Sequence, residues 1–319
     1  MTTPYPEIAP YRRGLLPVGD GQEVYWEACG DPAGKPALVL HGGPGSGCSA
    51  WHRRLFDPSR YDVFLLDQRN CGRSRPHASV ADIDLTSNTT HHLVADIELL
   101  RRCASVERWM VVGGSWGCAL ALAYAEAHPS RVSELVLFGV TAGLRREFDR
   151  VFRGGLAEEF PAAWARLRQA VLRDSQRDVD VVDATFELLF HSDAAVRARA
   201  AYEWCLWESA IPAWPRQMEL EPRFRDPAYA LAFARIVTHY VRHDAWLEDG
   251  ALFDGLDAIA NVPAVLIDGR HDPQTAATAQ MLTDRMPRAR HVIVGDAAHA
   301  ANDAIASEIV AATQRFVDG

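Results

Sequence analysis

One pentapeptide constrains the chain more than any other feature: Gly113-Gly114-Ser115-Trp116-Gly117. It follows the apolar run 109–112 and precedes the helical run 118–124, so a Gly-x-Ser-x-Gly pattern stands between a predicted strand and a predicted helix. A serine held on such a tight turn leaves no room for side chains two positions before and after it, and glycine meets that need. This context nominates Ser115 as a nucleophile.

Length, charge and cysteine spacing narrow the class of protein. The 319 residues are 48% apolar, which suffices for one large α/β domain with an insertion or for two domains. A net charge of −9, without clustered Lys and Arg, argues against nucleic acid and anionic membranes as partners. The six cysteines form no Cys-x-x-Cys pair, so neither a zinc ribbon nor a redox motif is suggested. We expect no metal and no other cofactor.

The amino-terminal segment and the hydropathy pattern bear on location. Residues 1–10 contain three prolines and lack the apolar core of a signal peptide, and no run is long enough to span a membrane. We therefore expect a cytoplasmic protein that acts on a small molecule or short peptide. The sequence does not indicate its oligomeric state.

Short apolar runs alternate with helical patterns in the first part of the chain. The predicted strands are 37–40, 63–66, 109–112 and 135–138, with a helix at 89–102. Near-continuous apolar strands separated by amphipathic helices indicate a parallel sheet that is covered on both faces.

The strand signal disappears from about residue 144 to residue 250 and then returns. The intervening segment is helical and rich in Arg, Ala, Glu and Trp, and strands resume at 263–269 and 291–294. The expected organisation is a core in two parts, residues 1–143 and 251–319, interrupted by an all-helical cap of residues 144–250.

A nucleophilic serine needs a base, which in turn needs an orienting group. Hydrolases with such a serine turn carry an acid and then a histidine later in the chain, each in a loop after a strand. Asp272 fits the acid better than Asp268, because Asp268 ends a strand. His299 fits the base better than His291, because His291 begins a strand.

Acyl transfer also needs hydrogen-bond donors aimed at the developing oxyanion. The backbone N–H of Trp116, directly after the nucleophile, is one candidate. The loop 41–45, with the sequence HGGPG, follows a predicted strand and supplies the other. We assign this second donor to Gly43, with Gly42 as the alternative.

Together these segments resemble the proline iminopeptidase family of α/β hydrolases over almost the whole chain. The matching segments are HGGPG at 41–45, DQRNCGRS at 67–74, GGSWG at 113–117, FARI at 233–236 and GRHD at 269–272. The resemblance implies an α/β-hydrolase fold, with a mostly parallel central sheet, helices on both faces and an inserted all-helical cap. It also implies a metal-independent serine aminopeptidase with the triad Ser115, Asp272 and His299 and a cap that selects a free amino-terminal residue.

The sequence departs from the family pattern at three places. Family members bind the substrate ammonium with two cap glutamates; Glu208 matches the first, whereas Val237 stands at the second. Thr141 and Val241 replace aromatic residues that usually pack on the prolyl ring. The expected activity is therefore cleavage of a small amide after an N-terminal residue such as proline, with another small amide or ester as the alternative.

Several features have competing interpretations. His239 and His243 are four residues apart, but without the glutamate of a zinc protease a packed or solvated pair is favoured. Glu208 is either paired with an arginine or available to a cation. Three tryptophans belong either to the cap core or to a substrate wall: Trp204, Trp207 and Trp214. A non-catalytic binding protein on the same fold is a further alternative, which an intact triad disfavours.

Overall fold

The structure is a computed structural model that describes residues 3–172, 179–212 and 218–318. At its centre lies one eight-stranded sheet with the order β1-β2-β4-β3-β5-β6-β7-β8. The strands are β1 (Arg12–Pro17), β2 (Glu23–Gly30), β3 (Lys35–Leu40), β4 (Tyr61–Leu66), β5 (Trp109–Gly114), β6 (Val132–Phe138), β7 (Ala264–Gly269) and β8 (Ala289–Val294). The strands from β4 to β8 pair in parallel, which confirms the predicted sheet.

The first two strands were not predicted from the sequence. β1 pairs antiparallel with β2, and β2 pairs antiparallel with β4. Neither strand has the continuous apolar run of a strand buried on both faces, because β1 is exposed at both ends and β2 mixes polar and apolar residues. An antiparallel edge with one solvated face gives this weaker pattern.

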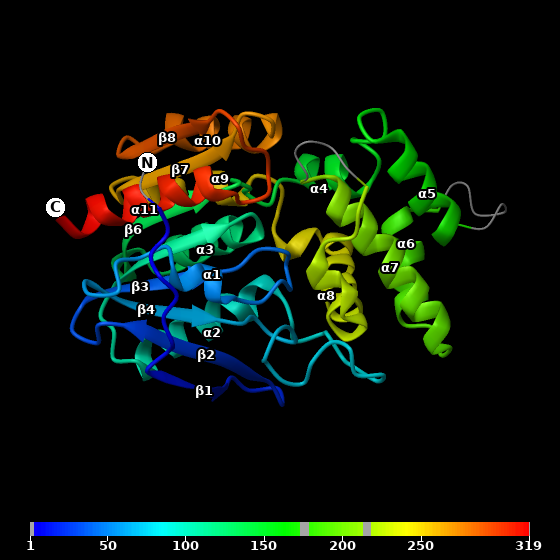
Figure 1. Ribbon diagram of the computed structural model, residues 1–319, viewed down its shortest axis with the longest axis horizontal. Helices are drawn as coiled ribbons and strands as arrows, with labels where there is room; N and C mark the ends of the chain where they lie inside the picture. Colours follow the sequence, from blue (N-terminus) through cyan, green and yellow to red (C-terminus); the bar gives the residue numbers. More distant parts are fainter. Residues whose placement is uncertain (1–2, 173–178, 213–217, 319) are drawn as a thin grey trace.

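Helices cover both faces of the sheet and form a separate group beside it (Figure 1). The α-helices are α1 (Ala50–Arg53), α2 (Thr90–Cys103), α3 (Trp116–Ala127), α4 (Arg145–Phe152), α5 (Pro161–Val171), α6 (Val181–Leu189), α7 (Ala194–Ala210), α8 (Pro227–Arg242), α9 (Ala251–Asp254), α10 (Pro273–Arg285) and α11 (Asp303–Asp318). Short 3₁₀ turns are η1 (Pro129–Arg131), η3 (Pro222–Arg225), η4 (Asp244–Trp246) and η5 (Gly255–Ile259).

Alternation along the central strands divides the core between the two faces. In β3, Leu38 and Leu40 belong to the cluster that includes residues of α2, α3 and α10, whereas Val39 belongs to the cluster with residues of α11. All three side chains are buried. Fully burying such a side chain contributes about 1.5–3 kcal/mol, so the two faces hold the strands in register.

All regular elements that the structure describes between β6 and β7 are helices. Helices α4 to α8 gather at one end of the molecule, at the right in Figure 1, while α9 to α11 lie with the sheet. Because β3 to β8 run in parallel, their carboxyl ends meet at one edge, and the loops after them carry the candidate site. No helix of the described residues is long and apolar enough to cross a membrane.

Candidate active site

Ser115 stands on a strained turn between β5 and α3. Its backbone has φ 52° and ψ −121°, a conformation that side-chain-bearing residues rarely adopt and that costs about 1–3 kcal/mol. The flanking glycines permit the turn: a Cβ on Gly113 would lie 2.3 Å from the Gly117 oxygen, and one on Gly117 would lie 2.1 Å from the Leu40 oxygen. The backbone segments therefore approach too closely for any larger residue at position 113 or 117.

The structure brings Ser115, His299 and Asp272 together in one hydrogen-bonded chain. Ser115 Oγ lies 2.9 Å from His299 Nε2, and Asp272 Oδ2 lies 2.6 Å from His299 Nδ1. His299 stands in the loop between β8 and α11, and Asp272 caps the amino terminus of α10. Gly139 leaves room for the imidazole, since a Cβ there would lie 3.3 Å from His299 Cε1.

The pKa values of His299 and Asp272 suit a general base that is oriented by a carboxylate. Burial disfavours the imidazolium, but the charge and hydrogen bond of Asp272 outweigh it and raise the pKa of His299 above its ordinary value. Burial acts in the opposite sense on Asp272, and the histidine again outweighs it and lowers the pKa of that carboxyl. Asp272 thus stays ionised at neutral pH and fixes the proton of the neutral ring on Nδ1, which leaves Nε2 as the acceptor.

The two alternative residues, Asp268 and His291, form a separate pair. Asp268 is fully buried, accepts a hydrogen bond from the Val140 N–H at 2.8 Å, and lies 3.1 Å from His291 Nε2. Both of its oxygens are therefore engaged away from the Ser115 chain.

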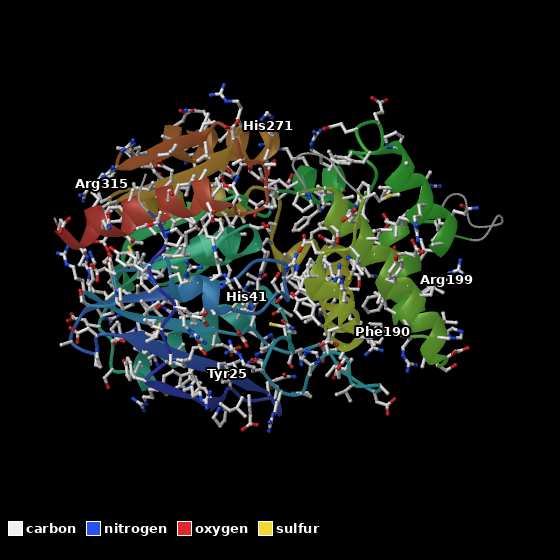
Figure 2. All side chains as sticks on the ribbon, in the orientation of Figure 1. Tyr25, His41, Phe190, Arg199, His271 and Arg315 are labelled. Atoms are coloured by element: carbon white, nitrogen blue, oxygen red, sulfur yellow. The ribbon has the colours of Figure 1, made fainter. Side chains whose placement is uncertain are left out.

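The glycine loop after β3 lies against the nucleophile. A Cβ on Gly42 would come within 2.9 Å of the Gly114 oxygen and 3.2 Å of Ser115 Cβ. Gly43 has φ 115°, where side chains are disfavoured. Trp116 begins α3 directly after Ser115, and the Gly42 contact places the loop 41–45, in which Figure 2 labels His41, against the same serine.

A cavity of about 1070 Å³ connects the serine with the helices α4, α7 and α8. Its wall includes all three members of the Ser-His-Asp chain, and it includes Thr141, Glu208 and Val241. Thr141 donates its hydroxyl hydrogen bond to the Ser115 carbonyl oxygen at 2.9 Å. Val237 is fully buried in the core and is not among the described residues that line the cavity.

Glu208 has an incompletely satisfied carboxylate at the cavity wall. Its Oε1 is buried without a hydrogen-bond partner among the described residues. Burial raises the pKa of Glu208 to about 7, Arg223 opposes this shift, and Glu221 adds to it. Arg223 itself is paired with Glu221 at 2.7 Å. Of the two interpretations, availability to a cation is the one that these contacts favour.

The remaining motifs are packed within the protein. His239 Nε2 lies 3.2 Å from the Asn88 oxygen, and His243 Nδ1 lies 2.8 Å from the His239 oxygen. No group of three potential metal ligands occurs among residues 3–172, 179–212 and 218–318. Trp204 and Trp207 are buried in the core, whereas Trp214 falls outside the described residues.

The functional assignment gains support from comparison with known proteins. The family model described as alpha/beta hydrolase fold matches residues 35–303, which together with the sheet defines the class. A probable proline iminopeptidase of Streptomyces coelicolor is 44% identical over 99% of this chain and 98% of its own. The proline iminopeptidase of Arabidopsis thaliana is 39% identical over 98% of this chain and 82% of its own. The chain belongs to the proline iminopeptidase family of α/β hydrolases and is a serine hydrolase of that type.

Solved structures show the same fold at lower identity. The proline iminopeptidase of Mycobacterium smegmatis superposes with a TM-score of 0.64 at 22% identity, over 96% of this chain and 98% of its own. VinJ superposes with a TM-score of 0.63 at 17% identity, over 97% of this chain and 99% of its own.

Three residues at the site had no role assigned from the sequence. Glu221 and Arg223 approach Glu208 from η3 and the segment before it, and no short motif reveals that contact. Gln68 makes buried hydrogen bonds to His41 and Trp116. Its place directly after a strand that neighbours β3 was the available signal, because parallel strands end at a common edge.

Proposed function

We propose that Ser115, His299 and Asp272 are the catalytic triad of an acyl-transfer reaction. The observation that carries this proposal is the unbroken chain of 2.9 and 2.6 Å contacts from the serine oxygen to the carboxylate. Ser115 Oγ attacks the substrate carbonyl carbon while His299 Nε2 accepts its proton. His299 then donates that proton to the leaving group, and an acyl-enzyme remains on Ser115.

Water completes the cycle by the same steps in reverse. His299 accepts a proton from the water, which attacks the acyl carbon, and then donates that proton to Ser115 Oγ as the bond between Oγ and the acyl carbon breaks. The backbone N–H groups of Gly43 and Trp116 stabilise the oxyanion of each tetrahedral intermediate. Such donors contribute about 3 kcal/mol each.

The favoured substrate is a small amide with a free amino-terminal residue. The names of the relatives support an iminopeptidase activity, and Glu208 Oε1, which has no hydrogen-bond partner among the described residues, offers an anchor for a substrate ammonium. Thr141 and Val241 also line the cavity, whereas Val237 is buried in the core. Aromatic residues such as Phe148, Phe152 and Phe233 line the cavity as well. The changes at positions 141, 237 and 241 relative to the family pattern support a second candidate: another small amide or an ester.

The division of labour follows the chain. We assign the chemistry to a core of residues 1–143 and 251–319 and the choice of substrate to a helical cap of residues 144–250. The cavity wall supports this division, because its serine-bearing side comes from loops after the strands and its Glu208 side from α7.

A panel of substrates tests the proposed function. Proline, alanine and phenylalanine arylamides are compared with simple aryl esters, and a fluorophosphonate probe with mass spectrometry identifies the labelled residue. We expect label on Ser115 and turnover in the panel, with proline arylamide cleaved weakly beside the esters. A folded protein that leaves Ser115 unlabelled and turns over nothing would instead be a binding protein.

A further inference from the structure

Gln68 lies between two loops that meet at Ser115. It follows β4, which pairs in parallel with β3, so it stands beside the loop after β3. Its side chain is almost fully buried. The amide oxygen accepts a hydrogen bond from Trp116 Nε1 at 3.0 Å, and the amide nitrogen donates to the His41 carbonyl oxygen at 2.8 Å. One amide thus joins the residue after the nucleophile to the residue before Gly42.

Gln68 also determines which nitrogen of the His41 ring carries the proton. Its backbone N–H donates to His41 Nε2 at 3.0 Å, so that nitrogen is the acceptor and Nδ1 carries the proton of the neutral ring. His41 Nδ1 then donates to the Gly42 carbonyl oxygen at 2.9 Å. Burial lowers the pKa of His41 and keeps the ring neutral. The histidine therefore holds the Gly42 carbonyl in one direction.

The direction of that carbonyl decides where the next N–H points. The Gly42 oxygen and the Gly43 N–H belong to one planar trans peptide, in which the two groups point in opposite directions. A second donor, the Ser46 N–H, also reaches the Gly42 oxygen, at 3.2 Å. With its carbonyl held from one side, this peptide presents its N–H to the other.

We propose that Gln68 is a positioning residue that aligns both donors of the oxyanion hole, Trp116 through the indole and Gly43 through His41. This inference rests on the proposed function, because it assigns those two N–H groups to the oxyanion. Gln68 does not touch the substrate. It acts by fixing the two loops relative to each other, since a donor contributes only when it is aimed at the developing charge.

The test compares kcat and KM for an aryl ester in a set of variants. Gln68→Met keeps the length of the side chain and removes both amide contacts; we expect kcat to fall about 10- to 100-fold with KM nearly unchanged, as for a small misplacement of catalytic groups. Gln68→Glu keeps an acceptor for the indole but sets an oxygen against the His41 carbonyl, and its kcat falls at least as far. Trp116→Phe removes the indole N–H and part of the ring but keeps the backbone donor of residue 116, and we expect a smaller loss of kcat.

The chain offers a matched control in Gln22, a second buried glutamine. Its amide oxygen accepts from Asn70 at 3.0 Å, its amide nitrogen donates to Ser87 at 3.3 Å, and it touches neither oxyanion loop. Gln22→Met should lower the melting temperature and leave kcat unchanged. In a double-mutant cycle, the combined loss in Gln68→Met with Trp116→Phe should be smaller than the product of the two single losses, because they share one hydrogen bond.

Several outcomes would overturn the inference. A folded Gln68→Met with wild-type kcat, an effect confined to KM, or an equal loss of kcat in Gln22→Met would each assign Gln68 a structural role only. If Gln68→Met does not fold, Gln68→Glu and Trp116→Phe decide by the same criteria. Activity that survives Ser115→Ala would instead refute the proposed function. An inactive Ser115→Ala beside an unaffected Gln68→Met refutes this inference alone.

Discussion

The sheet edge and the helical wall of the cavity satisfy their polar groups differently. At the sheet edge, His299 has a partner on each ring nitrogen, Ser115 on one side and Asp272 on the other. At the helical wall, an oxygen of Glu208 is buried without a partner among the described residues. A completed network holds one geometry, whereas an incomplete one leaves a place for a ligand.

This contrast separates the chemistry of the reaction from the choice of substrate. Changes at the sheet edge should lower the rate with every substrate. Changes at the helical wall should act on some substrates and spare others. The following predictions use that distinction.

The largest effect is expected from Ser115→Ala. Removing the attacking oxygen should lower kcat about a millionfold with all substrates, as in other serine hydrolases. Alanine fits the same turn, so the melting temperature should stay nearly unchanged. Steady-state kinetics and thermal unfolding check both points, and a variant with more than about a thousandth of the original rate would contradict the assignment.

Asp272→Asn should be the next most severe change. An amide cannot stabilise the imidazolium or hold the correct tautomer of His299, a loss worth about 10⁴-fold in kcat. Asp268→Asn is the matched control, because Asp268 pairs with His291, and its kcat should fall less than about tenfold. If the two variants exchanged these results, the acid of the triad would be Asp268.

Glu208→Gln should distinguish substrates. Removing the charge that faces a substrate ammonium costs about 2 kcal/mol or more, so KM for amino-acyl arylamides should rise at least about 30-fold. An aryl acetate, which has no ammonium, should be unaffected. Glu126→Gln is the control, since Glu126 is another glutamate with a buried unpartnered oxygen and a pKa raised by burial to about 8, and it does not line the cavity. Equal effects on both classes of substrate would place Glu208 in the common chemistry.

The smallest effect concerns pH. His299 must be neutral to accept the serine proton, and its pKa is raised, so kcat/KM for an aryl ester should fall with acid from a midpoint above pH 6.5. The negative charge of Glu208 contributes to that rise, so Glu208→Gln should move the midpoint to lower pH. A pH–rate profile of both proteins measures the shift. A midpoint that moves upward would contradict the sign of this interaction.

The fold could be predicted from the sequence where burial of a strand requires a run of apolar residues. The apolar runs that became β3 to β7 lie under helices on both faces, so they gave near-continuous apolar strands, whereas the edge strand β8 is only partly buried. β1 and β2 could not be predicted in this way, because strands at the edge of a sheet bury fewer of their side chains. Comparison with related proteins supports the hydrolase class and the family.

The residues of the proposed triad could be predicted from the sequence, whereas the wall of the cavity could not. Ser115, Asp272 and His299 each follow a strand, and topology alone brings such loops together. The influence of Arg223 on Glu208 depends instead on how η3 packs against α8, which no local sequence pattern records. Gln68 lies between these two cases. Its position at the edge of the sheet follows from the strand before it, but its proposed role follows only from its hydrogen bonds.

The register between β6 and β7 determines where the helical segment between them begins and ends. Leu135 pairs with Ala264 and Phe138 with Ile267, so the long helical excursion leaves one strand and returns to the neighbouring one. Because the two strands are parallel, the excursion leaves the carboxyl end of β6 and returns to the amino end of β7, and α9 and η5 come last before that return. The pairing of these two strands fixes where the excursion begins and ends, so its helices can differ in length and sequence without a change in the register of the sheet.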